Sequence, residues 1–231
     1  MSGLLIAATD TECGKTVLTC ALIAYWQRFC AARRLGILKP LQSGEGDREL
    51  YQSLFQLDQS LEDLNPVFYH APLAPPVAAA LENTVVDLAP AWQRYQTLTQ
   101  ECDWVLVEGL GGLGSPVTDE MTVADLAADW RLPVVLVVPV KLGAISAAVA
   151  NVALARQHQL KLQGIVLNCT TPDAVDRVER LTPPDMISSL TRIPVLGVLP
   201  YFQDPTALES LSEAARQLTL EALMPQTFWA A

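Results

Sequence analysis

The sequence of 231 residues has few of the residues that build metal centres and disulfide frameworks. It contains two histidines, and its five cysteines are scattered along the chain without a Cys-x-x-Cys pair. Zinc sites and disulfide scaffolds need such clusters, so the sequence argues against both. An odd, scattered set of cysteines is typical of reduced thiols, and we therefore expect a cytoplasmic protein.

Long apolar runs are missing as well. The longest covers residues 132–140, lies between Arg131 and Lys141, and is far shorter than the ~20 residues that span a bilayer. The first residues have no positive segment ahead of their short apolar run, so no signal peptide is expected. These features predict a soluble protein without a membrane partner.

Positive charge is scarce. The chain has 15 Lys and Arg against 25 Asp and Glu, which gives a net charge of −10, and no run is rich in Lys or Arg. Nucleic acids and anionic membrane surfaces attract basic patches, so we expect neither as a partner. A local phosphate site is still compatible with this charge, because a few backbone amides and lysines can bind an anion inside a negative protein.

Apolar residues make up 51% of the chain, which predicts a folded core. Short apolar runs alternate with amphipathic stretches from end to end. This alternation predicts an α/β fold in which helices cover both faces of a parallel sheet. The expected strands are 4–8, 35–39, 103–108, 133–140, 164–168 and 194–199. No linker or repeat interrupts the pattern, so we expect a single domain over residues 1–231.

Helical patterns lie between the expected strands. Apolar residues at helical spacing cover residues 18–29, and the segments 144–158 and 207–223 are rich in Ala and Leu. Thr122 and Asp125 have the spacing of a capping box and predict a helix through residue 130. Regular structure is expected to end at Pro40, and the proline-rich segment 72–76 is interpreted as a turn or loop.

The strongest functional signal follows the first strand, where the chain reads ATDTECGKT. Gly14, Lys15 and Thr16 supply a close backbone, a cation and a hydroxyl at a helix start, which is the pattern of a phosphate-binding loop. Ala8 stands in place of the usual first glycine, and five residues rather than four separate it from Gly14. The alternative is a chance Gly-Lys-Thr at a helix start.

Other polar residues lie at the carboxyl ends of expected strands. Glu108 ends one strand and could hold Mg²⁺, or it could be a surface carboxylate that opens a turn. Lys39 ends another, and could be a second cation beside the phosphates or a solvated lysine. Ser43 and Asp47 follow in the next loop. Parallel strands place such residues at one edge of the sheet, where ligands bind.

Three further positions carry weaker signals. Lys141 precedes the helix expected from residue 144, whose amino end would suit an anion. Cys13 has no histidine near it in the sequence and is interpreted as a packing residue rather than a nucleophile. The two histidines, His70 and His158, have no partners in the sequence and are interpreted as structural or surface groups.

Six segments, in this order and spacing, resemble the dethiobiotin synthetase family from Leu4 to Tyr201. They are TDTECGKT, GILKPLQSG, WVLVEGLGG, VVPVKLGA, GIVLN and GVLPY. The phosphate loop of that family has the same extra residue. The resemblance implies a homodimer of P-loop α/β subunits, with each active site at the interface. It also implies that ATP, 7,8-diaminopelargonate and CO₂ or bicarbonate are substrates and that Mg²⁺ is the cofactor.

The resemblance further implies the roles of individual residues. Lys39 and Lys15 would be catalytic, and Ser43 would contact the substrate. Thr16, Asp47 and Glu108 would surround Mg²⁺. The residues implied to bind ATP are Glu12, Cys13, Gly14, Lys15, Thr16, Val17, Asp47, Glu108, Gly109, Leu110, Gly111, Asn168, Cys169, Pro200, Tyr201 and Phe202. Two positions depart from the family pattern, namely Ala8 in place of glycine and Pro76 where histidine is common.

Two other functions are compatible with a phosphate-binding loop in an α/β fold. Cell-division and plasmid-partition ATPases share the expected fold and carry an additional lysine early in the phosphate loop, whereas residues 9–13 contain none. The synthetase half of a glutamine-dependent amidating enzyme has a similar loop but needs a glutaminase domain, for which 231 residues leave no room. An assay of phosphate release would separate the three functions, because only the dethiobiotin synthetase reaction requires the diamine and bicarbonate together.

Overall fold

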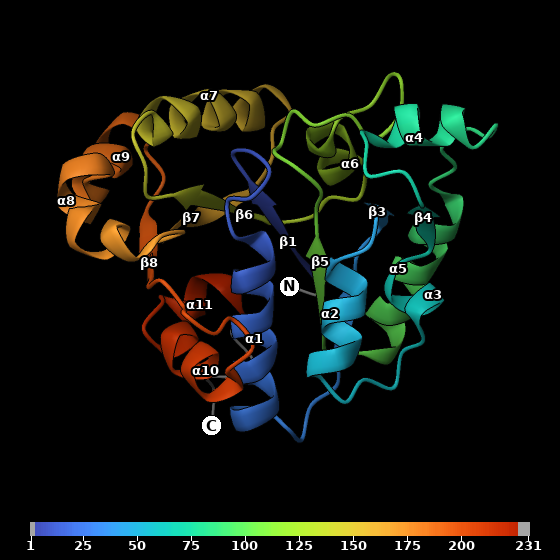
Figure 1. Ribbon diagram of the computed structural model, residues 1–231, viewed down its shortest axis with the longest axis horizontal. Helices are drawn as coiled ribbons and strands as arrows, with labels where there is room; N and C mark the ends of the chain where they lie inside the picture. Colours follow the sequence, from blue (N-terminus) through green and yellow to red (C-terminus); the bar gives the residue numbers. More distant parts are fainter. Residues whose placement is uncertain (1–2, 226–231) are drawn as a thin grey trace.

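The main sheet has six parallel strands in the order β2-β5-β1-β6-β7-β8 (Figure 1). The computed structural model describes residues 3–225. The strands are β1 (Gly3–Ala8), β2 (Leu35–Leu38), β5 (Trp104–Glu108), β6 (Val134–Pro139), β7 (Leu162–Asn168) and β8 (Val195–Leu199). All six expected strands are confirmed, with ends that shift by at most two residues. The predicted parallel α/β fold is thus correct.

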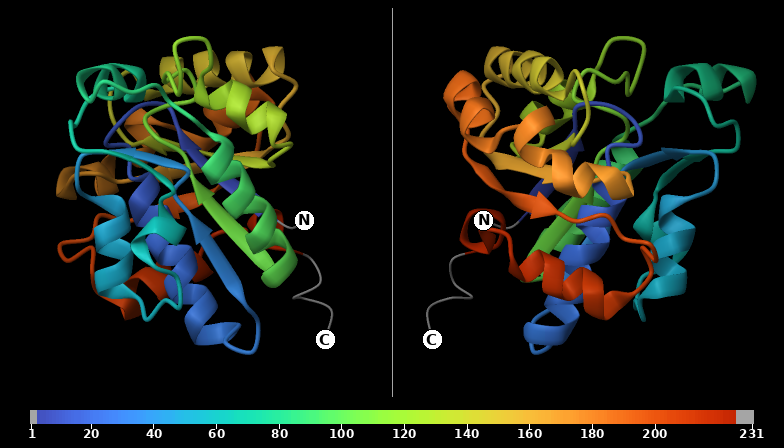
Figure 2. Two further views of the ribbon diagram at one scale, coloured as in Figure 1. Left: turned by 90° about the vertical axis from the view of Figure 1, so that its right-hand side faces the viewer. Right: turned by 60° about the vertical axis from the view of Figure 1, so that its left-hand side comes forward.

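Alternate residues of β1 point into two separate halves of the core. Leu4 and Ile6 pack against one set of helices, and Leu5 and Ala7 pack against the other. The first set is α1 (Lys15–Phe29), α2 (Asp47–Leu54), α3 (Leu61–Leu64), α10 (Leu208–Arg216) and α11 (Leu220–Leu223). The second includes α4 (Pro75–Leu81), α5 (Ala89–Glu101), α6 (Val123–Asp129), α7 (Ala144–Gln157) and α9 (Pro184–Thr191). Both faces of the sheet are therefore covered (Figures 1 and 2).

Local signals explain where several helices begin. The Thr122 hydroxyl and the Asp125 carboxylate are 2.7 Å apart, and they form the predicted capping box at the start of α6. The 3-10 helix η1 (Pro172–Arg177) and α8 (Val178–Leu181) connect β7 to α9. Within residues 3–225, no helix has the length and apolar character needed to cross a membrane.

Two local expectations were wrong, and one was incomplete. Segment 72–76 is not entirely a loop, because Pro75 and Pro76 begin helix α4. Proline is tolerated in the first turn of a helix, since the backbone N–H groups there have no hydrogen-bond partner within the helix. The helix expected over 207–223 is divided, since the Thr219 amide donates to the Leu196 carbonyl of β8 (2.8 Å) instead of continuing the helix. Regular structure is interrupted at Pro40 as expected, since β2 ends at Leu38, but it resumes at once: β3 (Leu41–Ser43) pairs in parallel with β4 (Val67–Tyr69) in a separate small sheet.

Candidate active site

The loop between β1 and α1 has the geometry that a phosphate-binding loop requires. Gly14 has a φ of 93°, in the left-handed region that favours glycine, and α1 begins at the next residue. A Cβ at this position would lie 1.9 Å from Nδ2 of Asn168. That amide donates to the Cys13 carbonyl (3.0 Å) and ties the loop to the end of β7. Ala8, where glycine is usual, is the fully buried last residue of β1.

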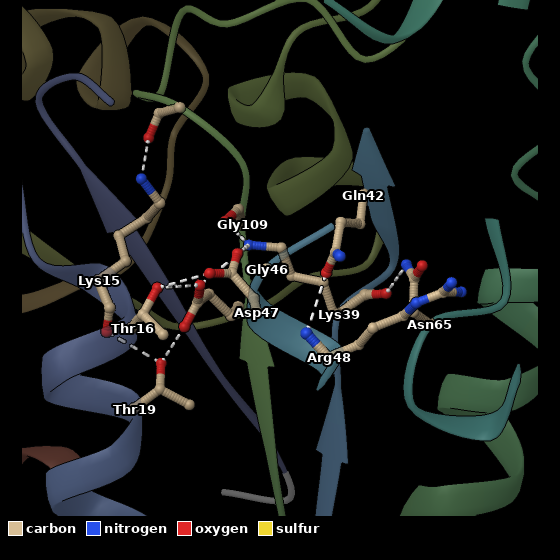
Figure 3. A network of polar contacts seen from close by, with 12 residues as sticks. Lys15, Thr16, Thr19, Lys39, Gln42, Gly46, Asp47, Arg48, Asn65 and Gly109 are labelled. Atoms are coloured by element: carbon tan, nitrogen blue, oxygen red, sulfur yellow. Dashed lines mark hydrogen bonds and ion pairs between the residues drawn. The ribbon is translucent and has the colours of Figure 1, made fainter. Parts of the chain in front are cut away.

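Lys15 extends from the first turn of α1 across this loop. Its Nζ atom donates to the Gly111 carbonyl (2.8 Å) and lies 3.4 Å from the Asp10 carbonyl, which draws the loop towards the segment after β5 (Figure 3). Burial lowers the pKa of Lys15, and the Glu108 charge opposes that effect only in part. The ammonium thus lies where an entering anion would gain a partner.

A hydroxyl and two carboxylates meet beside Lys15. The Thr16 hydroxyl is 2.9 Å from Oδ1 of Asp47 and 3.0 Å from Oε1 of Glu108. The three side chains come from the starts of α1 and α2 and from the end of β5, and Figure 3 shows those of Thr16 and Asp47 side by side. Oxygen donors of this kind suit Mg²⁺, which protein sites bind through one or two carboxylates together with substrate phosphates and water.

Lys39 follows β2 and contacts both carboxylates. Its Nζ atom donates to Oε1 of Glu108 (2.9 Å), to the Gly109 carbonyl (3.2 Å) and to Oδ2 of Asp47. The Asn65 amide donates to the Lys39 carbonyl (2.7 Å) and fixes the backbone there. Burial lowers the pKa of Lys39, but the charges of Glu108 and Asp47 outweigh burial, so its pKa lies above the ordinary value.

Burial decides between the alternative interpretations of the two strand-end residues. Lys39 is 3% exposed and Glu108 is 1% exposed. The solvated lysine and the surface carboxylate are therefore both wrong. Burial raises the pKa of Asp47, but contacts with Lys39 and Thr16 reverse this effect and hold the pKa below its ordinary value. The cluster thus keeps its charges paired inside the protein.

Two cavities meet at the phosphate loop. One, of about 690 Å³, lies between the loop, the small sheet and α4, and Ser43 and Leu110 line it. The other, of about 440 Å³, lies between the loop and the ends of β7 and β8. Glu12, Lys15 and Thr16 line both cavities. Two ligands could therefore be held end to end, with their junction beside Lys15.

The structure brings most of the expected ATP-binding residues to the second cavity. Its lining includes Glu12, Gly14, Lys15, Thr16, Val17, Asn168, Cys169, Tyr201 and Phe202. Gly111 lines the first cavity, and Gly109 contacts Lys39. Pro200 lines a neighbouring cavity of about 730 Å³ against α10 instead. Cys13 lines neither cavity: it is fully buried, in line with a packing role, and its carbonyl accepts the hydrogen bond from Asn168.

Two side chains of the cluster were missed in the sequence. The hydroxyls of Thr19 and Tyr51 both donate to Oε2 of Glu108, and both residues are fully buried. A threonine in the apolar helix α1 and a tyrosine in the amphipathic helix α2 are typical of core residues and give no functional signal. The only available clue is their spacing, three residues after Thr16 and four residues after Asp47, which places each pair on one helix face.

The weaker sequence signals lie outside this cluster. Lys141 is exposed ahead of α7 and lines neither cavity. His158 does have a partner, since its Nδ1 atom lies 3.3 Å from Oδ1 of Asp125, a contact that the sequence did not reveal. His70 is exposed and its ring packs edge-on against that of Phe68.

Curated relatives match nearly the whole chain. An ATP-dependent dethiobiotin synthetase of Gloeothece citriformis is 56% identical over 97% of this chain and 100% of its own length. Proteins with the same description from Crocosphaera subtropica and a Synechocystis species are 50% and 49% identical, and cover 96% and 95% of this chain and 100% and 94% of their own lengths.

Solved structures and a family model add the wider fold. The MinC:MinD cell division protein complex of Aquifex aeolicus matches 96% of this chain and 94% of its own chain, with a TM-score of 0.56 and 14% identity. A ParA family ATPase from Chlorobium tepidum matches 97% and 99%, again with a TM-score of 0.56 and 14% identity. At this identity the likeness shows the fold alone. A family model described as an AAA domain matches residues 2–208. The chain belongs to that AAA domain family and to the dethiobiotin synthetase family.

Proposed function

We propose that the protein closes the cyclic urea of dethiobiotin from 7,8-diaminopelargonate and CO₂ at the expense of ATP. The observation that carries the proposal is the pair of cavities that meet at Glu12, Lys15 and Thr16. One cavity suits a nucleotide and the other a second, extended substrate, so the terminal phosphate and an acceptor anion would face each other beside Lys15. The names of the close relatives agree with this reaction.

The proposed reaction has three steps: carbamate formation, phosphoryl transfer and ring closure. One amine of the diamine attacks the carbon of CO₂ and loses a proton, which gives a carbamate. A carbamate oxygen then attacks the γ-phosphorus of ATP, ADP leaves, and a carbamic-phosphoric anhydride forms. The second amine attacks the anhydride carbon, loses its proton and expels phosphate, which closes the ring. No side-chain nucleophile is needed, so the protein has to position the reactants and stabilise negative charge.

Lys39 and Lys15 are proposed to neutralise the charge that accumulates as two anions meet. Lys15 is mostly buried, at 7% exposure, and already donates to a carbonyl at the cavity junction, which a phosphate oxygen would replace. Lys39 lines the substrate cavity beside Asp47. The Ser43 hydroxyl is buried in the same cavity and has no hydrogen-bond partner within the described residues. We therefore assign it to the diamine or its carbamate.

Thr16, Asp47 and Glu108 fit a magnesium ion. The Thr16 hydroxyl oxygen lies 2.9 Å from a carboxylate oxygen of Asp47 and 3.0 Å from one of Glu108. Two carboxylates and a hydroxyl leave most of the coordination sphere to phosphate oxygens and water, which is the usual arrangement for Mg²⁺. When bound there, Mg²⁺ would neutralise charge on the phosphates of ATP.

The nucleotide base is proposed to lie against the ends of β7 and β8. Asn168 is 3% exposed, and its Oδ1 atom is buried without a hydrogen-bond partner among the described residues, while Nδ2 holds the Cys13 carbonyl. A buried acceptor of this kind favours an amino group on the ligand. The adenine amino group fits that requirement. Tyr201 and Phe202 line the same cavity and would contact the ring.

Phosphate release tests the reaction. With MgATP present, release should need the diamine and bicarbonate together, because the phosphoryl acceptor is the carbamate. The four combinations of the two substrates, present or absent, provide the controls. Phosphate release at the full rate without the diamine would instead favour a nucleotide-switch ATPase.

We also propose a homodimer. Exposed apolar residues gather on α4, on α7 and just ahead of α7: Val77, Leu81, Leu142 and Val149 are 50%, 64%, 88% and 38% exposed. The two helices lie at the same end of the molecule in every view (Figures 1 and 2). Burial of such a face in a second copy is favourable. Light scattering should give about twice the 25.1 kDa of the chain, and an active species of 25.1 kDa would contradict the proposal.

A cytoplasmic location is proposed as well. All five cysteines are free thiols, which supports a reducing compartment such as the cytoplasm. Fractionation of cells that express the protein, with detection of the protein in each fraction, tests this location.

A further inference from the structure

The two carboxylate oxygens of Glu108 have different surroundings. Oε1 lies towards the site, 3.0 Å from the Thr16 hydroxyl and 2.9 Å from Nζ of Lys39. Oε2 lies towards the core and accepts hydrogen bonds from the hydroxyls of Thr19 and Tyr51. A free carboxylate can exchange its two oxygens by rotation about its last bond. Here each oxygen has partners that the other lacks.

We infer that the hydroxyls of Tyr51 and Thr19 are positioning groups, which hold Oε2 so that Oε1 remains the oxygen presented to Thr16 and the metal. The inference rests on the proposed role of Glu108 in holding Mg²⁺. Residues that hydrogen-bond a metal-binding carboxylate orient it and commonly change metal affinity by about 10- to 100-fold.

Tyr51 supplies a hydroxyl that packing alone does not require. Its ring lies in an apolar cluster with Leu22, Phe55 and Leu64, and the residue is fully buried. Phenylalanine would fill nearly the same volume without the cost of burying a polar group. The hydroxyl is therefore explained by its acceptor, Glu108. Helix α2 carries both Asp47 and Tyr51, one turn apart on one face, and so places two groups of the site together.

Thr19 is the weaker of the two donors. Its single hydroxyl hydrogen can bond Oε2 of Glu108 or the Lys15 carbonyl, which lies 3.0 Å away on the preceding turn of α1. A hydroxyl with two acceptors satisfies only one of them at a time. The phenolic hydrogen of Tyr51 bonds Oε2. Loss of the Tyr51 hydroxyl should therefore disturb Glu108 more than loss of the Thr19 hydroxyl.

The test measures how strongly Mg²⁺ enhances nucleotide binding. Calorimetry gives the Kd of ADP in EDTA and at a series of Mg²⁺ concentrations for the wild type, Tyr51→Phe, Thr19→Val, Thr19→Ser and Glu108→Gln. We expect Tyr51→Phe to reduce the enhancement by about tenfold and to leave the Kd in EDTA unchanged. Thr19→Val should have a smaller effect, and Thr19→Ser, which keeps the hydroxyl, should restore the wild-type value.

Tyr25→Phe is the matched control. This buried tyrosine is on α1, about 13 Å along the helix from Thr16 at 1.5 Å per residue, and its ring packs on Phe29. The Mg²⁺ enhancement should not change in this variant. Thermal unfolding of every variant reports separately on stability, which a structural role alone would lower.

The outcomes separate this inference from the function on which it rests. If Glu108→Gln binds ADP with the wild-type dependence on Mg²⁺, the metal role of Glu108 is wrong and the inference is overturned with it. If Glu108→Gln loses that dependence while Tyr51→Phe keeps it, the inference alone is overturned. The same holds if Tyr51→Phe weakens binding equally in EDTA and in Mg²⁺. Should Tyr51→Phe not fold, an unchanged Mg²⁺ dependence in Thr19→Val overturns the inference.

Discussion

Replacement of Lys39 by glutamine removes the positive charge that lies between Asp47 and Glu108. The ammonium contacts both carboxylates, and the Lys39 and Glu108 side chains are 4% and 0% exposed, so water cannot take over the role of the lost cation. Glutamine keeps much of the length but can donate only neutral hydrogen bonds. In the variant, the carboxylates of Asp47 and Glu108 therefore stay close together without the cation that neutralises them.

The size of the effect follows from burial. Removal of one partner of a buried ion pair costs about 3–5 kcal/mol in free energy of unfolding. The Asp47 side chain is 31% exposed, so solvent relieves part of its charge and favours the lower value. About 3 kcal/mol corresponds to a fall of roughly 6–12 °C in Tm for a chain of this size. Loss of an electrostatic contact to the reacting groups lowers kcat by about 10²–10³.

Thermal unfolding with and without Mg²⁺ is the decisive assay. Mg²⁺ should raise the Tm of Lys39→Gln more than that of the wild type, because the cation can replace the missing ammonium between the carboxylates. In the folded protein the pKa of Lys39 lies above its ordinary value of 10.5. The stabilisation by the Lys39 ammonium is therefore complete below pH 10.5, and it is lost only as the pH rises through the raised pKa. The difference in Tm should thus be constant from about pH 7 to 9.

Lys161→Gln, at an exposed lysine, is the control and should unfold like the wild type. A Tm of Lys39→Gln within a degree or so of the wild type, with no added response to Mg²⁺, would refute the reasoning from burial. A kcat within a few-fold of the wild type at saturating substrates would refute the catalytic role of Lys39.

Three further predictions concern other parts of the molecule. Thr16→Val should lower kcat by about 10- to 100-fold with little change in Tm, and a wild-type rate at saturating MgATP would show that its hydroxyl binds no metal. Asn168→Ala should weaken ATP binding by about tenfold in calorimetry, and an unchanged Kd would remove this residue from the base-binding site. Asp125→Asn should lower Tm at neutral pH, because hydrogen bonds from Thr122 lower the pKa of Asp125 in the folded state. That stabilisation is present above pH 3.8, the ordinary pKa of an aspartate, and is lost as the pH falls through the lowered pKa of Asp125. The difference in Tm between the wild type and Asp125→Asn should therefore shrink in acid. Asp129→Asn is the exposed control, and a difference that stayed constant in acid would contradict the assignment.

The main sheet could be predicted because its strands are uninterrupted apolar runs, a pattern typical of strands buried on both faces. The small sheet could not. Its strands, β3 and β4, are three residues long, and one begins directly after Pro40, which on sequence grounds ends regular structure. The division of the last helix also has a distant cause, since the Thr219 amide bonds a carbonyl of β8. The pattern of residues within one segment cannot predict hydrogen bonds to a distant strand.

The candidate site divides in the same way. Lys15, Thr16 and Glu108 could be found because their positions at strand and helix ends are themselves the signal. Lys39 could be named from the sequence but not proved buried, since its burial depends on two carboxylates from elsewhere in the chain. Tyr51 could not be found, because a tyrosine in an amphipathic helix carries no mark of the residue to which its hydroxyl is bonded.

The placement of the small β3–β4 sheet has an evolutionary consequence. The cavity proposed for the nucleotide is built from the phosphate loop and the segments that follow β7 and β8, whereas the cavity proposed for the second substrate takes much of its wall from β3 and from the residues around the start of α4. These walls belong to the chain between β2 and β5. Mutations and length changes in β3 and around the start of α4, away from Lys39 and Asp47, can reshape the cavity proposed for the phosphoryl acceptor while the phosphate loop stays unchanged. Changes confined to these walls are thus a route by which a phosphate-loop fold acquires a different phosphoryl acceptor.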